Sequence, residues 1–331
     1  MMSENFIEDE SVSYQILAGA VNFEVEGVIF RLPKSILQRY ESSAFSNMIG
    51  DSNNESNLPI HLTDTREAFT EFRRVVYTPL ESCLSHHHRL SKDLEKVLMV
   101  QKLAHKYCLS VMENMAASAA LNLAADAELL RSHTTASLTP LDILVHALDV
   151  ECEELAVTAR NVVKEDLWAS TLCPYDVISG LNNYNEGEVQ ATAYYQILLK
   201  GQNNWLYEKR LDRSHHHYLY IGIANLSAEW ESVFADWGSL FHVGIHMPVT
   251  NGWNIWCVYC ELHSRIWRNL GAKRFQQFDV LGKLKAIKSW TTFPKYSEVV
   301  LPAVTEQINR IEGKIHSFFQ DPHEIPVTES S

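Results

Sequence analysis

Apolar and polar residues alternate from Val21 to Val25, which is the period-two pattern of a half-buried strand. Glu26-Gly27 is typical of a turn, so Val28–Leu32 is predicted to return as a second strand. Pro33 suits the first position of a helix, because the N–H that it lacks has no intrahelical partner there. Lys34–Tyr40 is predicted to be that helix. The segment therefore predicts a hairpin that leads directly into a helix.

Helical spacing of apolar residues dominates the chain beyond one further strand. Leu58–Leu62 is predicted to be this third short strand. Thr63–Thr65 offers caps for a helix that begins at Arg66. Residues 93–125 are predicted to form two helices, with a break near Cys108–Ser110.

The middle of the chain contains a weak internal repeat. Residues 139–160 and 173–195 match at an offset of 34, with five identities, and each segment opens with a proline and then an aspartate. Both residue types favour the first turn of a helix. The match predicts two consecutive helical hairpins, with a chance similarity as the alternative. Leu226–Phe241 and Val304–Phe319 carry the apolar stripe of amphipathic helices.

Composition limits the classes of function. The 331 residues are 46% hydrophobic and 21% charged, which is typical of a globular protein with two or three domains. A formal charge of −13 disfavours nucleic acid and anionic membranes as partners. The chain has no apolar run long enough to span a bilayer, and its start does not resemble an export signal. The six cysteines are therefore expected to be reduced thiols in the cytoplasm, the nucleus or both.

Residues Val21–Ala120 resemble a BTB/POZ domain, in the divergent form that is abundant in fungal proteins. The segments FEVEGVIFRLPKSIL, SSAFSNMI and LPIHLTDTREAFTEFRRVVYT carry this resemblance. VLMVQKLAHKYCLSVMENMAASAAL resembles the closing helix pair, and residues 139–201 resemble the helical extension that follows the domain in fungal proteins. The implied fold is an α+β domain, a small sheet capped by helices, followed by a mainly α-helical C-terminal region.

The resemblance implies a core and a domain order. The implied domain core consists of Phe30, Leu37, Phe45, Met48, Leu62, Phe69, Phe72 and Tyr77. The expected parts are a disordered N-terminus (1–14), the BTB/POZ-like domain (15–122), a helical hairpin extension (123–201), a Trp-rich, mainly helical region (202–319) and a flexible tail (320–331). Such a domain binds protein through its exposed faces. The expected partner is a second copy of the chain or a cullin-type ubiquitin-ligase scaffold, for which the chain would be a substrate adaptor.

The alternative function is a metal-binding or catalytic module in the C-terminal region. Cys257, Cys260 and His263 have a spacing that could supply three zinc ligands, although a structural zinc site needs four. Buried reduced cysteines on a Trp-rich helix are the competing interpretation, and no cofactor is expected under it. The common nucleophile, phosphate-loop and dinucleotide motifs are missing from the sequence. The sequence therefore favours a non-enzymatic protein.

Two further polar patterns are interpreted as solvent-exposed. The histidine runs His86–His88 and His215–His217 are expected to be surface loop residues, with a pH-dependent association as the alternative. The basic segment around Lys283 is expected to be a solvated helix face. Its cations are Lys273, Arg274, Lys283, Lys285 and Lys288.

Overall fold

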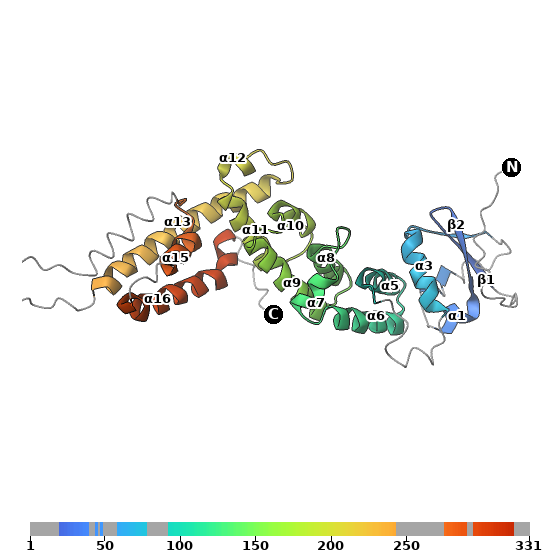
Figure 1. The fold of residues 1–331 in the computed structure, drawn as a ribbon. Coiled ribbons are helices and arrows are strands. Elements are labelled where there is room, and N and C mark those ends of the chain that lie inside the picture. The colour runs from blue at the N-terminus through green and yellow to red at the C-terminus, as the bar shows by residue number, and fades with distance from the viewer. Residues whose placement is uncertain are drawn as a thin grey trace, which may run out of the picture. The chain divides into compact units, whose positions relative to one another are not determined.

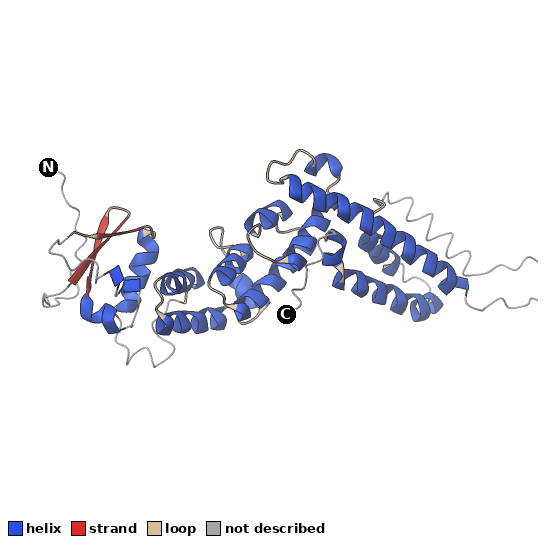
Figure 2. Cartoon of the chain, turned by 180° about the vertical axis from the view of Figure 1, so that it is seen from behind, coloured by secondary structure: helices blue, strands red, loops and turns tan. Residues whose placement is uncertain are grey.

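The computed structural model describes residues 20–39, 44–45, 47–48, 58–77, 92–242, 275–289 and 294–320. The described chain is mostly helical, with one small sheet near its N-terminus (Figure 1, Figure 2). It divides into two compact units, residues 1–163 (unit 1) and 164–331 (unit 2). The boundaries predicted after residues 122 and 201 lie inside these units, and the observed division falls within a helix.

Unit 1 begins with the sheet and two helices. Its elements are β1 (Ala20–Val25), β2 (Val28–Pro33), α1 (Lys34–Arg39), β3 (Ile60–Leu62) and α3 (Arg66–Val76). The unit continues with α5 (Leu94–Lys106), α6 (Ser110–Leu123), α7 (Ala127–Ser132), α8 (Pro140–Asp149) and the first part of α9 (Glu153–Trp168). The hairpin, the third strand and the helix pair broken near residue 109 are therefore confirmed.

The sheet has the strand order β2-β1-β3, so β1 is the central strand. β1 pairs antiparallel with β2 and parallel with β3, and Phe23 lies opposite both Phe30 and Ile60. The turn residues Glu26 and Gly27 have φ angles of 48° and 76°. A two-residue hairpin turn with positive φ at both positions matches the right-handed twist of the strands.

Pro33 corrects one sequence expectation. It is the last residue of β2, opposite Ala20, and α1 begins one residue later at Lys34. In an antiparallel pair of strands, hydrogen-bonded and non-hydrogen-bonded residue pairs alternate. Val25 and Val28, which flank the turn, are a hydrogen-bonded pair, so Ala20 and Pro33, five pairs further on, are a non-hydrogen-bonded pair. The strand therefore loses no ladder bond at Pro33, which is how an edge strand accommodates a proline.

The helix α3 lies along one side of the hairpin (Figure 1), and aromatic rings of the helix pack against those of the sheet. The ring of Phe69 lies 4.9 Å from that of Phe30 and 5.9 Å from that of Phe23, measured between centroids. Phe45 stacks on Tyr107 of the α5–α6 turn at 4.6 Å, and it lies 6.1 Å from Phe72. Such ring pairs stabilise a core beyond the burial of their area.

The structure buries five of the eight predicted core residues and leaves three half-buried. Phe30, Leu37, Phe45, Phe69 and Phe72 are buried. Met48, Leu62 and Tyr77 are half-buried. Leu62 belongs to β3, which among the described strands has a neighbour on one side only. Tyr77 has a different role, because its hydroxyl donates to the backbone carbonyl of Arg31 at 2.9 Å.

A buried carboxylate ties the start of α3 to the end of α5. Asp64 accepts hydrogen bonds from the hydroxyl of Tyr107 and, at 2.6 Å, from Nζ of Lys106. Burial is the main cause that raises the pKa of Tyr107, and the hydrogen bond to Asp64 adds to it. The tyrosine is therefore a neutral donor at every physiological pH. Thr65, next to Asp64, caps α3 by accepting from the N–H of Ala68, as the sequence predicted.

The helical hairpins α5–α6 and α8–α9 have turns of the same backbone conformation, 43 residues apart. The sequence pattern does not predict this repeat. In the first turn the N–H groups of Cys108 and Leu109 donate to the carbonyls of His105 and Ala104. Glu151 and Cys152 make the equivalent two bonds in the second turn. This is a Schellman motif, which needs a left-handed residue after the helix. Cys108 and Glu151 occupy that position, each with a φ of 54°.

Replacing Glu151 with Gly is expected to raise the free energy of unfolding by about 0.5–1 kcal/mol, because glycine adopts positive φ without a Cβ penalty. Urea denaturation of the purified chain measures the change. Glu154→Gly is the matched control, since the same substitution three residues later, inside α9, is expected to destabilise by about 1 kcal/mol. If both variants lost stability, the positive φ of Glu151 would not be a source of backbone strain.

Unit 2 contains the second part of α9 and a set of helices. They are α10 (Pro174–Gly180), α11 (Gly187–Leu199), α12 (Gln202–Trp205), α13 (Arg213–His242), α15 (Val280–Lys288), α16 (Pro294–Gly313) and the 3₁₀ helix η1 (Ile315–Phe319). The two hairpins predicted at an offset of 34 are present as α8–α9 and α10–α11, with Pro140 and Pro174 each at the start of a helix. Both predicted amphipathic segments are helical, and the second breaks at Lys314.

The core of unit 2 is built where α11, α13 and η1 meet. The ring of Tyr194 stacks on that of Phe319 at 5.5 Å. Gly222 of α13 makes this contact possible, because a Cβ at that position would overlap the ring of Phe319. Tyr195, the next residue of α11, donates to the carboxylate of Asp279 at 2.7 Å. Asp279 in turn accepts from the N–H of Gly282 and so caps α15.

Candidate protein-binding surface on the N-terminal sheet

The face of the sheet that points away from the aromatic core is the candidate site in unit 1. Because paired residues share a face, Glu24 of β1 lies beside Ile29 of β2 and His61 of β3, while Arg31 lies opposite Asn22. We call Glu24, Ile29, Arg31 and His61 the sheet surface. Its composition follows from the alternation of β1 and β2, which buries Val21, Phe23, Val25, Phe30 and Leu32 on the opposite face.

The sheet surface combines an exposed apolar side chain with charges. Ile29 is 41% exposed. His61 and Glu24 form a pair in which Nδ1 lies 3.2 Å from the carboxylate oxygen. Arg31 is exposed, and its guanidinium makes no ion pair within the part of the chain that the structure describes. An exposed isoleucine beside an available arginine is a combination that protein interfaces use.

The hairpin that carries the sheet surface is fixed from two sides. At the turn, the carboxylate of Glu26 accepts from the N–H of Arg66 at 3.0 Å, which joins the hairpin to the start of α3. At the other end of β2, the hydroxyl of Tyr77 binds the Arg31 carbonyl, and the ring of Tyr77 lies 5.6 Å from the guanidinium of Arg73. A partner would therefore meet a preformed surface, which reduces the entropy lost on binding.

Among the described strands, both outer strands of this sheet have one unpaired edge. β2 and β3 pair only with β1 in the described residues, so each presents backbone N–H and C=O groups on its outer side. The Tyr77 hydroxyl occupies one such carbonyl on β2. Leu58, just before β3, is 74% exposed. Free edges with exposed apolar neighbours are places where another polypeptide can add a strand.

The predicted zinc ligands Cys257, Cys260 and His263 lie outside the described residues, as do His86–His88. Within the described ranges, no group of three or more His, Cys, Asp or Glu side chains is placed to hold a metal ion. Cys108, Cys152 and Cys173 are free thiols. No helix in these ranges has the length and apolar character that a membrane span requires.

The second histidine run corrects an expectation. Residues 215–217 belong to the first turns of α13 rather than to a loop, and His215 is buried, while His217 is exposed as expected. Its Nδ1 lies 2.8 Å from the hydroxyl of Tyr194, and its backbone N–H donates to Asp212. Burial lowers the pKa of His215, against the opposing effect of the Asp212 carboxylate. His215 therefore belongs to the core of unit 2.

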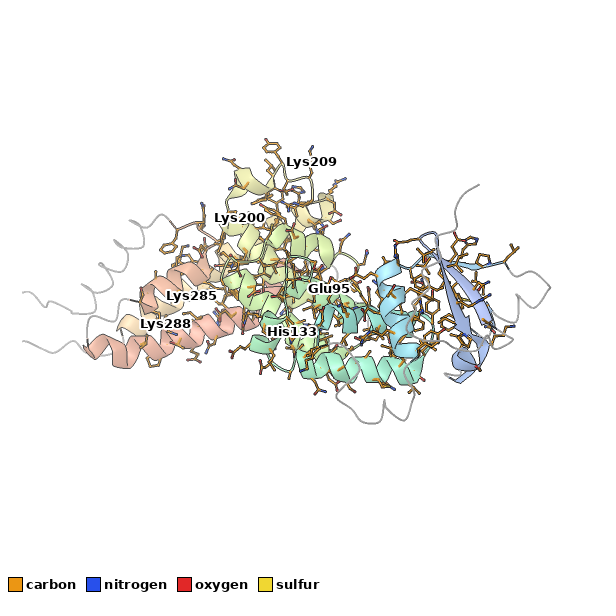
Figure 3. The ribbon with its side chains drawn as sticks, turned by 45° about the vertical axis from the view of Figure 1, so that its right-hand side comes forward. Glu95, His133, Lys200, Lys209, Lys285 and Lys288 are labelled. Atoms are coloured by element: carbon orange, nitrogen blue, oxygen red, sulfur yellow. The ribbon has the colours of Figure 1, made fainter. Side chains whose placement is uncertain are left out.

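The basic segment also departs from its expected role as a solvated face. Lys283 is buried, with Nζ 2.6 Å from the carbonyl of Gln277 and 4.4 Å from the ring centroid of Trp230. Burial lowers the pKa of Lys283 to about 8. Lys285 and Lys288 are exposed on α15 (Figure 3). Lys285 lies 2.8 Å from the carboxylate of Glu312. Lys273 and Arg274 lie outside the described residues.

Comparisons with known proteins give no family for this chain. No family model, curated protein or solved structure matches this chain.

Proposed function

We propose that this chain is a non-enzymatic protein-interaction protein whose N-terminal unit contains a BTB/POZ-like domain. One observation carries the proposal: in the part of the chain that the structure describes, an open-edged sheet exposes Ile29 and an Arg31 that makes no ion pair. The order of elements in unit 1 supports it further. A hairpin, a short helix, a third strand, a helix and a closing helix pair follow one another in the order that the resemblance implies.

The partner under this proposal is a second copy of the chain or a cullin-type scaffold. The charges of the sheet surface favour a partner that places a carboxylate opposite Arg31. The apolar side chain of Ile29 would supply the buried centre of the contact. Unit 2 and the remaining helices of unit 1 would recruit a further protein or support the domain.

The double variant Ile29→Glu with Arg31→Glu tests the proposal. It is expected to weaken association at least about 10-fold, because it places two carboxylates where an apolar contact and a cation stood. Light scattering across a concentration series measures self-association of the full chain. Biolayer interferometry measures binding to a purified cullin-type scaffold.

Val111→Glu is the matched control. Val111 is also an exposed β-branched residue of unit 1, with an exposed fraction of 50%, but it belongs to α6 and not to the sheet. The control is expected to associate as the wild type does. Equal association of the double variant and the wild type would reject the sheet surface as the binding region, and a chain that is monomeric and does not bind the scaffold would reject both partners.

A further inference from the structure

An open cavity of about 260 Å³ lies in unit 2, where α12, α13 and the turn before α15 meet. This is many times the roughly 10–15 Å³ that a cavity needs to hold one water, so the cavity has room for several waters. This volume suits one small organic ring with its substituents. No sequence motif indicates it, because residues near positions 202, 225 and 277 contribute its walls.

The polar part of the wall is formed by amides and a hydroxyl. Gln202, Gln276, Gln277 and Ser227 line the cavity, and none of the described lining residues is charged. The three glutamines are exposed, and their side-chain amides bond to no other described residue. Each amide offers two donors and one acceptor. The described wall offers a charged ligand no opposite charge, so it favours a neutral ligand rich in hydrogen-bonding groups.

The indole of Trp205 offers no open face on which an aromatic ligand could stack. Trp205 lines the cavity, but it is 1% exposed, since Tyr220 meets it edge-to-face at 5.4 Å and His216 lies at 5.9 Å. Its ring faces are therefore already covered. Ile223 and Phe278, both half-buried, remain to contact aliphatic C–H groups of a ligand. Polyhydroxylated rings present both kinds of surface, hydroxyls at the edge and C–H groups on the faces.

The walls are held in place by hydrogen bonds behind them. The N–H of Asp279 donates to the carbonyl of Gln276 at 3.0 Å, and that of Val280 donates to Phe278 at 2.8 Å. Nζ of Lys283 donates to the carbonyl of Gln277 from the buried side. On the opposite wall, Nε2 of His216 lies 3.3 Å from the carbonyl of Trp205. These bonds fix the backbone that carries the amides, so the cavity is preformed.

We propose that this cavity binds a neutral, polyhydroxylated ligand of monosaccharide size. The glutamine amides bind its hydroxyls, and Ile223 and Phe278 contact its C–H face. The site is independent of the sheet surface of unit 1. It would add recognition of a small ligand to a protein-interaction chain.

Saturation-transfer NMR on the full chain tests the proposal, with glucose, mannose and myo-inositol as probes at millimolar concentrations. At least one probe is expected to bind saturably. Gln276→Ala is expected to weaken that binding about 3- to 10-fold, which corresponds to the loss of one hydrogen bond. Asn203→Ala is the matched control, because Asn203 is an exposed amide on α12 that does not line the cavity. It is expected to bind as the wild type does.

Three results would overturn the proposal. The first is the absence of saturable binding for all three probes. The second is equal binding by the wild type and Gln276→Ala, which would place the sugar elsewhere on the chain. The third is tighter binding of glucuronate, the carboxylate counterpart of glucose, or of adenine, a planar ring, because either would contradict the neutral and non-stacking character of the wall.

Discussion

Replacing Phe45 with Ala is expected to lower the free energy of unfolding of unit 1 by about 3–5 kcal/mol. Phe45 is 1% exposed and contacts three aromatic rings, stacking on Tyr107 and lying within 6.1 Å of Phe23 and Phe72. The substitution removes these contacts and leaves a cavity that rigid neighbours from the sheet, α3 and the α5–α6 turn cannot fill.

Urea denaturation followed by far-ultraviolet circular dichroism measures this loss. All eight tryptophans lie at or beyond Trp168, in unit 2, so tryptophan fluorescence of the same samples follows the other unit. Val111→Ala, a truncation of an exposed apolar residue of unit 1, is the control and is expected to change stability by less than about 0.5 kcal/mol. An unchanged unfolding midpoint in Phe45→Ala would contradict the aromatic core.

A half-buried histidine of unit 1, His146, is expected to make the chain less stable in mild acid. Nε2 of His146 lies 3.1 Å from Oε1 of Gln101, which is itself buried. Burial is the main cause that lowers the pKa of His146 to about 4, and the charge of Lys102 acts in the same direction. The neutral imidazole is therefore the form that the folded chain holds.

The direction of the pH effect follows from the two states of His146. In the unfolded chain its pKa is about 6.5. Between pH 6.5 and about 4 the unfolded state therefore binds more protons than the folded state, and stability falls as the pH decreases through this range. The pKa difference of about 2.5 units corresponds to a contribution of about 3 kcal/mol, which is fully present above pH 6.5.

The variant His146→Gln separates this effect from other titrating groups. Glutamine retains a donor for Gln101 and carries no charge at any pH. Urea denaturation at pH 7 and at pH 4.5 measures the free energy of unfolding of both proteins. Between these pH values the wild type is expected to lose about 2–3 kcal/mol more of this free energy than the variant. If both proteins lost the same stability between these pH values, a low pKa for His146 would be excluded.

The sequence predicted the parts of unit 1 that depend on local patterns. Alternation identified β1 and β2, Thr65 identified the start of α3, and the break near Cys108 separated α5 from α6. These signals work because each element must bury one face and satisfy its own terminal N–H groups. The half-burial of Leu62 and Tyr77 was not predictable from the same signals, since it depends on the strand order of the sheet.

The repeated turn of α5–α6 and α8–α9 was missed for a specific reason. A Schellman turn is recognised in a sequence by glycine at its left-handed position, and here Cys108 and Glu151 stand in its place. The flanking core residues also differ in type, as Tyr107 and Val150 show. The match is therefore one of backbone conformation and burial, with few identities to reveal it.

Residues that unit 2 buries were assigned to the surface for a related reason. His215 is buried against Tyr194, and Lys283 against Trp230, partners that lie 21 and 53 positions earlier in the chain. A polar residue type predicts exposure unless its partner is known, and the partners come from other helices. The cavity near Gln276 depends in the same way on segments that only the fold brings together.

The central claim is that the sheet surface of unit 1 binds a protein, and one measurement tests it most directly. Quantitative mass spectrometry would identify the proteins captured from cell extract by the full-length chain, by Ile29→Glu with Arg31→Glu, and by Val111→Glu. We expect a partner that the wild type and Val111→Glu retain in equal amounts and that the double variant loses. Equal retention by all three proteins would contradict the claim.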